Sequence, residues 1–145
     1  MAFTIAALTT EINTDPKALG YATLKAQTNG PEAVAAKLNE AGASAETLFK
    51  SYVPIEDVIA AIVISEYAAA TAANRTFLEN VLLKGSKLKS GDANLRTSMA
   101  AIFAAGTTSR ANLVALASRS ASRAEALWGE GYVVSASQAS EAMGG

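Results

Sequence analysis

Apolar positions recur along the chain at the three- and four-residue spacing of helices, in short runs separated by turn residues. The first run places Ile5, Leu8 and Ile12 on one face of a helix that Thr4 can cap and that ends before Pro16. No two segments alternate as paired strands do. The pattern predicts an all-α fold of about six to eight short helices with no substantial sheet.

Prolines mark further helix starts in the first half of the chain. Pro31 suits the first turn of a helix that runs through Asn39, and Ser44 can open a short helix over residues 45–51. Pro54 permits another start, preceded by an extended step. This helix is expected to bury a stripe made of Ile55, Val58, Ile59 and Ile62.

The middle of the chain has the strongest helical patterns. Ser65 is the expected N-cap of one long helix that continues to Leu82. Asp92 is the expected cap of the next helix, and Thr107 or Thr108 caps the one after it. Each of these helices has an apolar face that needs a partner.

Two capping boxes follow near the C-terminus. Ser122 has Glu125 three residues on, and Ser135 has Gln138 at the same spacing, so each pair can satisfy the first N–H groups of a helix. Gly129 is a natural stop for the first of these two helices.

The length of 145 residues is ordinary for one domain with its own core. We therefore interpret residues 1–145 as a single helical domain, in which residues 1–30 form an N-terminal arm that can be extended and residues 130–145 form a C-terminal tail. Isolated helices this short are marginal, so their stability must come from packing on each other or on neighbouring subunits.

Composition removes most catalytic chemistry. The chain has no cysteine and no histidine, which excludes thiolate nucleophiles, the usual zinc sites and Ser-His hydrolases. The formal net charge of −1 argues against general nucleic-acid binding. The longest apolar run, residues 58–64, is far too short for a membrane span. We expect no enzymatic activity and no cofactor.

The charged residues have structural interpretations beside functional ones. Arg119 and Arg123 would share a face if one helix ran through residues 120–122. That face is then either solvated, with Arg123 paired to Glu125 or Glu130, or a polar contact with a partner chain. The adjacent acids at positions 56 and 57 suit the start of a helix better than a catalytic pair.

The only tryptophan, Trp128, and Tyr132 flank two glycines. A lone tryptophan at a helix end is more often a core plug than an interface anchor, and a ligand platform is rarer still.

Three stretches, "LTTEINTDPKALGYA", "RTSMAAIFAAGTTSR" and "ANLVALASRSASRAEALWGEGYVVSASQ", together resemble a family of small structural proteins of tailed bacteriophages. Its members open with a T-E-I-x-x-D-P-x-x-x-G-Y-like segment and close with an S-R-A-E-x-L-[FW]-G-x-G-x-x-V-like segment. The matching residues are Glu11, Ile12, Asp15, Pro16, Gly20, Tyr21, Ser122, Arg123, Ala124, Glu125, Leu127, Trp128, Gly129, Gly131 and Val134.

The resemblance implies a non-enzymatic virion subunit that assembles in the host cytoplasm. The expected position is a head-tail connector ring in the neck; a capsid decoration protein is the alternative, and a cytoplasmic helical binding module is the alternative outside the virion. Expected partners are further copies of the chain and portal, capsid or tail proteins, without a membrane or specific nucleic acid, although DNA can pass nearby. The candidate interface or packing residues are Tyr21, Arg119, Arg123, Trp128 and Tyr132.

Overall fold

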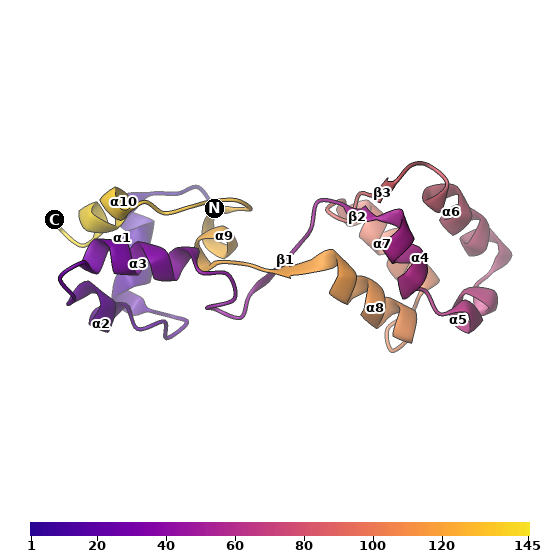
Figure 1. The fold of residues 1–145 in the computed structure, drawn as a ribbon, viewed down its shortest axis with the longest axis horizontal. Helices are drawn as coiled ribbons and strands as arrows, with labels where there is room; N and C mark the ends of the chain where they lie inside the picture. The colour runs from indigo at the N-terminus through magenta and orange to yellow at the C-terminus, as the bar shows by residue number, and fades with distance from the viewer. The chain divides into compact units, whose positions relative to one another are not determined.

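A computed structural model describes all residues from 1 to 145, and most of them lie in ten helices. The mostly helical class is therefore confirmed, with two small two-stranded sheets added. The chain forms two compact units, where one domain was predicted (Figure 1). Unit 1 contains residues 1–48 and 120–145, and unit 2 contains residues 49–119. The division arises because the apolar helix faces close into separate cores.

Unit 1 is built from the two ends of the chain. Its helices are α1 (Ile5–Thr14), α2 (Tyr21–Lys25), α3 (Gly30–Asn39), α9 (Arg123–Trp128) and α10 (Ala136–Ala142). Helix α3 packs against α2, α9 and α10, and α1 packs against α10 (Figure 1).

The core of unit 1 takes side chains from all five helices, among them Leu8, Tyr21, Leu38, Trp128 and Ala139. Residues 1–30 are therefore part of the core and not an extended arm, and residues 130–145 end in a packed helix. The physical reason is that the apolar faces of α1 and α10 cover each other.

One glycine allows a close approach in unit 1. A Cβ atom at Gly30 would lie 2.6 Å from the carbonyl oxygen of Lys25, so only glycine lets α3 begin this close to the end of α2. At the C-terminal end of α3, the Asn39 side-chain amide bonds both backbone groups of Val134, donating to its carbonyl at 2.8 Å and accepting from its N–H at 2.9 Å.

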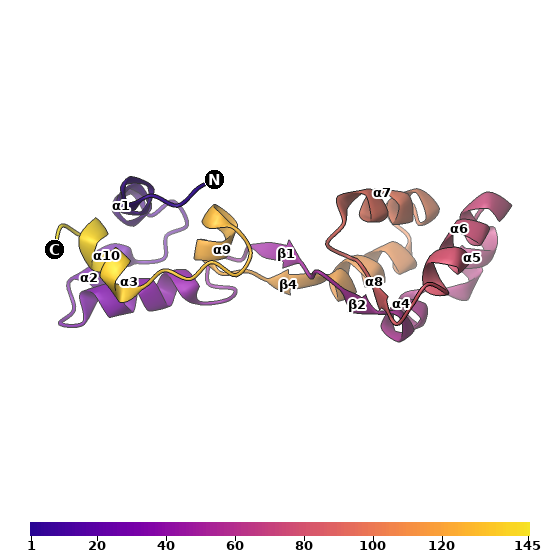
Figure 2. The same ribbon diagram turned by 90° about the horizontal axis from the view of Figure 1, so that it is seen from above.

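Unit 2 is a set of short helices with two thin cores. Its helices are α4 (Ile55–Ala61), α5 (Ile64–Ala69), α6 (Ala72–Leu82), α7 (Ala93–Ile102) and α8 (Thr108–Ala117). Figure 2 shows these helices from above. Strands β2 (Val53–Pro54) and β3 (Lys87–Leu88) pair antiparallel, with Val53 opposite Leu88.

The chain leaves unit 1 through β1 (Thr47–Phe49) and returns through β4 (Ser118–Ser120), and these two strands pair. The helix expected over residues 45–51 is therefore wrong, because β1 finds its hydrogen-bonding partner some 70 residues further along the chain. Strand β4 also separates Arg119 from Arg123, so the shared helical face predicted for them does not exist.

The long helix expected from Ser65 to Leu82 is broken between α5 and α6. Thr71 caps α6 by accepting a hydrogen bond from the N–H of Asn74 at 3.2 Å. The Arg75 guanidinium donates to the carbonyl oxygens of Ala68 and Ala70, at 2.9 and 2.7 Å. These bonds satisfy the backbone groups that the break exposes.

The cap expected at Ser65 is wrong, because α5 begins at Ile64 after Val63 and has no side-chain cap. Five other predicted caps are present. Thr4, Asp92 and Thr107 each accept from a first-turn N–H group, and both predicted capping boxes are present. Each capping side chain bonds to a backbone group three residues away, so the sequence alone predicts the cap.

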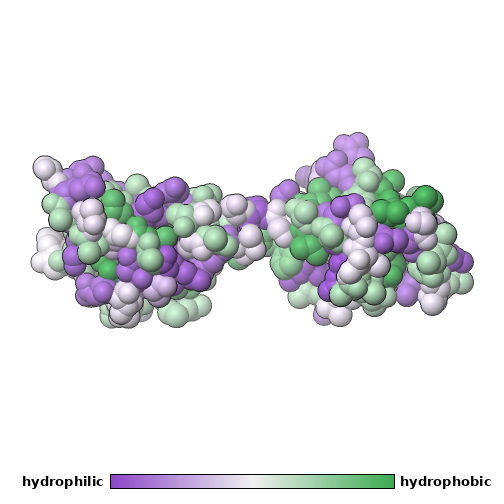
Figure 3. All heavy atoms as spheres, turned by 90° about the horizontal axis from the view of Figure 1, so that it is seen from below, coloured by the Kyte–Doolittle hydropathy of each residue, from purple (hydrophilic) through white to green (hydrophobic).

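Unit 2 leaves much of its apolar surface uncovered. Helix α5 has no buried residue, α6 buries only Leu78, and α8 buries only Ser109. The stripe predicted for α4 is half wrong, since Ile55 and Val58 are buried but Ile59 is 55 % exposed. Hydrophobic side chains are visible at the surface in Figure 3. The large exposed apolar residues of unit 2 are Phe49, Tyr52, Ile59, Ile64, Phe77, Leu83 and Val114.

Candidate functional site

A buried ion pair in unit 1 joins Arg123, the first residue of α9, to Glu11 of α1. The Nε atom of Arg123 donates to Oε1 of Glu11 at 2.7 Å, and Nη2 donates to Oε2 at 3.0 Å. The two side chains are 10 % and 5 % exposed. A bidentate pair of this kind is geometrically specific, so it fixes α9 on α1.

The remaining guanidinium nitrogen extends the cluster towards solvent. Nη1 of Arg123 donates to Oε1 of Glu46 at 2.8 Å, and Ser44 donates to the other carboxylate oxygen at 2.9 Å. Lys17 lies 3.6 Å from Glu46 and is 42 % exposed. The cluster therefore connects both sequence halves of unit 1 through charge-assisted bonds.

Tyr21 closes the buried side of the cluster by donating to Oε1 of Glu11 at 3.3 Å. Burial, followed by the negative charge of Glu11, raises the pKa of the Tyr21 hydroxyl far above its usual value. The hydrogen bond to Glu11 raises the pKa of Arg123. Tyr21 therefore stays neutral and Arg123 stays charged, which suits a structural role for both.

Asp15 organises the turn that delivers Tyr21. Its carboxylate accepts from the N–H groups of Leu19 at 2.7 Å and Gly20 at 2.8 Å. Gly20 has φ of 83°, a left-handed conformation that glycine adopts without strain. The D-P-x-x-x-G-Y spacing in the sequence therefore corresponds to this turn.

Glu125 has the capping role that its spacing from Ser122 predicted. Its carboxylate accepts from the N–H of Ser122 at 3.1 Å and from the N–H of Gly131 at 2.9 Å. The predicted pairing of Arg123 with Glu125 or Glu130 is therefore wrong. Arg123 instead pairs with acids far away in the sequence, which local spacing does not reveal.

Three aromatic rings pack together beside α9. The ring of Phe3 lies 5.1 Å from those of Trp128 and Tyr132, and the latter two rings are 5.7 Å apart. Trp128 is 9 % exposed, and its buried Nε1–H has no hydrogen-bond partner. The Tyr132 hydroxyl accepts from the Gln138 amide at 3.2 Å.

The structure brings four of the five predicted residues into unit 1. Tyr21 and Arg123 belong to the polar cluster, Trp128 and Tyr132 belong to the aromatic cluster, and Arg119 lies in β4. The sequence did not identify Glu46 as a member of the polar cluster. No signal in the sequence could have found it, because Glu46 and Arg123 are 77 residues apart.

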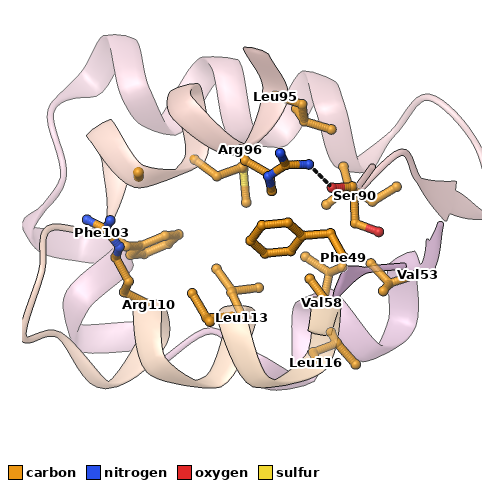
Figure 4. Close-up of a pocket in the computed structure, with 15 residues that line it drawn as sticks. Phe49, Val53, Val58, Ser90, Leu95, Arg96, Phe103, Arg110, Leu113 and Leu116 are labelled. Carbon is orange, nitrogen blue, oxygen red and sulfur yellow. Dashed lines mark hydrogen bonds between the residues drawn. The ribbon is translucent and has the colours of Figure 1, made fainter. Parts of the chain in front are cut away.

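Unit 2 contains an apolar pocket of about 170 Å³ between α7 and α8 (Figure 4). The Arg96 guanidinium lies 4.0 Å from the centre of the Phe49 ring and donates to the carbonyl of Ser90 at 2.9 Å. No acidic side chain lines the space. We call it the arginine-rimmed pocket, defined by Phe49, Arg96, Met99, Phe103, Arg110 and Leu113.

Glu66 of α5 binds the N-terminus of α8. Its two carboxylate oxygens accept from the N–H groups of Thr108 at 2.9 Å and Ser109 at 2.7 Å. Ser109 also accepts from the N–H of Val63 at 2.8 Å. Hydrogen bonds from the side chain and the backbone of Ser109 lower the pKa of Glu66 most; burial opposes them, and the Thr108 N–H adds a smaller lowering.

The lowered pKa predicts a pH-dependent contact. The stabilisation is present above the ordinary glutamate pKa, about 4.3, and is lost as the pH falls through the lower folded value. In the wild type, the protection factors of the Thr108 and Ser109 amides, which compare their exchange with the intrinsic rate at the same pH, should be high at neutral pH and low under acid. In Glu66→Gln the protection factors should be low at both pH values, as read by NMR. Glu56→Gln, another first-turn acid of unit 2, should leave them unchanged; equal protection in Glu66→Gln and wild type would contradict the role of Glu66.

None of the helices has the length and apolar character required to cross a bilayer. Likewise, the structure contains no group of three or more acidic, histidine or cysteine side chains placed to hold a metal ion. The polar clusters of both units consist of caps, ion pairs and turns.

No family model, no curated protein and no solved structure matches the chain.

Proposed function

We propose that the chain is a non-enzymatic structural subunit of a tailed-phage virion and that its copies form a ring in the head-tail connector. Its role is to associate with its own copies and with portal, capsid or tail proteins. The observation that carries the assembly role is the uncovered apolar surface of unit 2, whose helices bury few of their own residues. Surfaces of this kind mark protein interfaces.

The virion assignment rests on the resemblance of the two terminal motifs, and their contacts support it. The residues that carry the resemblance interlock within unit 1, where Glu11 pairs with Arg123, Asp15 shapes the turn before Tyr21, and Glu125 caps α9. Each motif residue so placed has a structural task.

The capsid decoration role and the cytoplasmic binding module make different predictions about copy number. A cyclic connector requires about a dozen copies per particle, whereas a capsid coat requires hundreds. Quantitative mass spectrometry of purified particles from the phage that encodes the chain measures this number directly. We expect the lower one. Hundreds of copies would support decoration, and absence from particles would refute both virion roles.

A further inference from the structure

Unit 2 carries a second apolar surface that shares no residue with the arginine-rimmed pocket. It surrounds a hollow lined by residues of α4, α5 and α6. Ile64 is its most prominent side chain, 76 % exposed, and Ile59 beside it is 55 % exposed. We call it the isoleucine patch, defined by Ile59, Ile62, Ile64, Tyr67, Glu79 and Leu82.

The charges on the two surfaces are opposite. The isoleucine patch holds the carboxylate of Glu79, which accepts from the Tyr67 hydroxyl. Glu56 is exposed three residues before Ile59, on the same side of α4. The arginine-rimmed pocket presents the guanidinium groups of Arg96 and Arg110 and no acid.

The pocket also has a suitable size. An apolar cavity of about 150 Å³ admits a benzene-sized group, and this one has about 170 Å³. One aliphatic side chain therefore fits. Ile64 is the best-placed donor, because it projects from a patch that carries the complementary charge.

We propose that the isoleucine patch of one copy docks into the arginine-rimmed pocket of the next copy, with Ile64 inserted and Glu79 and Glu56 facing Arg96 and Arg110. Patch against patch would place carboxylates together, and pocket against pocket would place guanidinium groups together. Only head-to-tail contact juxtaposes opposite charges. Contacts between two different surfaces of one chain generate rings when the rotation closes, so this inference deepens, and rests on, the self-association part of the proposed function.

The test uses two variants of the full chain that each destroy one surface. Ile64→Asp places a charge at the centre of the patch, and Arg110→Glu reverses a charge in the pocket. Ile64 is exposed and Arg110 is half-buried at the pocket, so circular dichroism and the Tm are measured first, and both should match the wild type. By sedimentation velocity, the wild type should form oligomers, and each variant alone should need at least tenfold higher concentration to do so, which corresponds to about 1.4 kcal/mol.

Mixing the variants separates head-to-tail contact from other arrangements. An equimolar mixture of Ile64→Asp and Arg110→Glu retains one intact interface, made by the pocket of the first and the patch of the second. It should form dimers and stop there. The matched control is Leu83→Asp, which adds the same acid at a leucine that is 83 % exposed and outside both surfaces; it should assemble as the wild type does.

Several results would overturn the docking proposal. These are a wild type that stays monomeric at its highest soluble concentration, a mixture that stays monomeric, or assembly that Leu83→Asp weakens as much as Ile64→Asp. If Ile64→Asp assembled as the wild type does but had a lower Tm at concentrations where it is a monomer, Ile64 would be covered within its own chain. The failures are distinguishable, since absence from particles refutes the virion role, whereas oligomers insensitive to both variants refute only this interface.

Discussion

Arg123→Met is expected to lower the free energy of unfolding by about 3 to 5 kcal/mol, because it leaves the Glu11 carboxylate buried without its ion-pair partner. The 5 % exposure of Glu11 prevents water from replacing the lost bonds. Methionine keeps most of the side-chain volume, so the loss reports charge and hydrogen bonding more than packing. Urea denaturation monitored by circular dichroism measures it.

Two comparisons make this prediction specific. Lys37→Met removes the exposed ion pair with Glu40, which has the same 2.7 Å separation in the same unit, and should change stability by no more than about 0.5 kcal/mol. Adding Glu11→Gln to Arg123→Met should recover part of the loss, since the uncompensated charge is gone while Tyr21 keeps an acceptor. An Arg123→Met chain as stable as Lys37→Met would contradict the structural role of the buried pair.

Trp128→Ala is expected to cost about 3 to 5 kcal/mol, because it opens a cavity in the core of unit 1 where the indole packs on Phe3 and Tyr132. Thermal unfolding of the full chain measures the effect. Trp128→Phe is the matched control: it keeps an aromatic ring and removes the buried Nε1–H that has no partner, so it should cost less than half as much.

An alternative outcome would change the interpretation of Trp128. If Trp128→Ala kept the wild-type Tm and lost only assembly, the residue would be an interface anchor and not a part of the core. The 9 % exposure of its side chain within unit 1 favours the core.

The caps of the helices were predictable because the groups that form them are close in sequence. Ser122 and Glu125, or Asp92 and the N–H of Leu95, lie three residues apart, and helix geometry alone brings them together. The same argument fails for the long helix predicted from Ser65. Its apolar spacing continues across Ala70, and the break depends on Arg75 folding back onto carbonyl groups.

The candidate sites were less accessible to sequence reasoning. The two terminal motifs could be identified separately in the sequence. The contact that joins them, the pairing of Glu11 with Arg123, links residues 112 positions apart. Nothing in the spacing around Phe49 or Arg96 indicates a pocket, since its walls come from residues 49–58, 88–103 and 110–117. Apolar periodicity also fails to distinguish a covered stripe from an uncovered one, as exposed Ile59 shows.

By itself, the sequence determined the helical class, the positions of most helix ends, and the absence of cysteine and histidine chemistry. These follow from local hydrogen bonding, side-chain periodicity and composition, which need no distant partner. Only the tertiary structure decided the division into two units, the partners of Arg123, and which apolar faces remain uncovered. Such features depend on which surfaces meet in space, and burial is a property of both members of a contact.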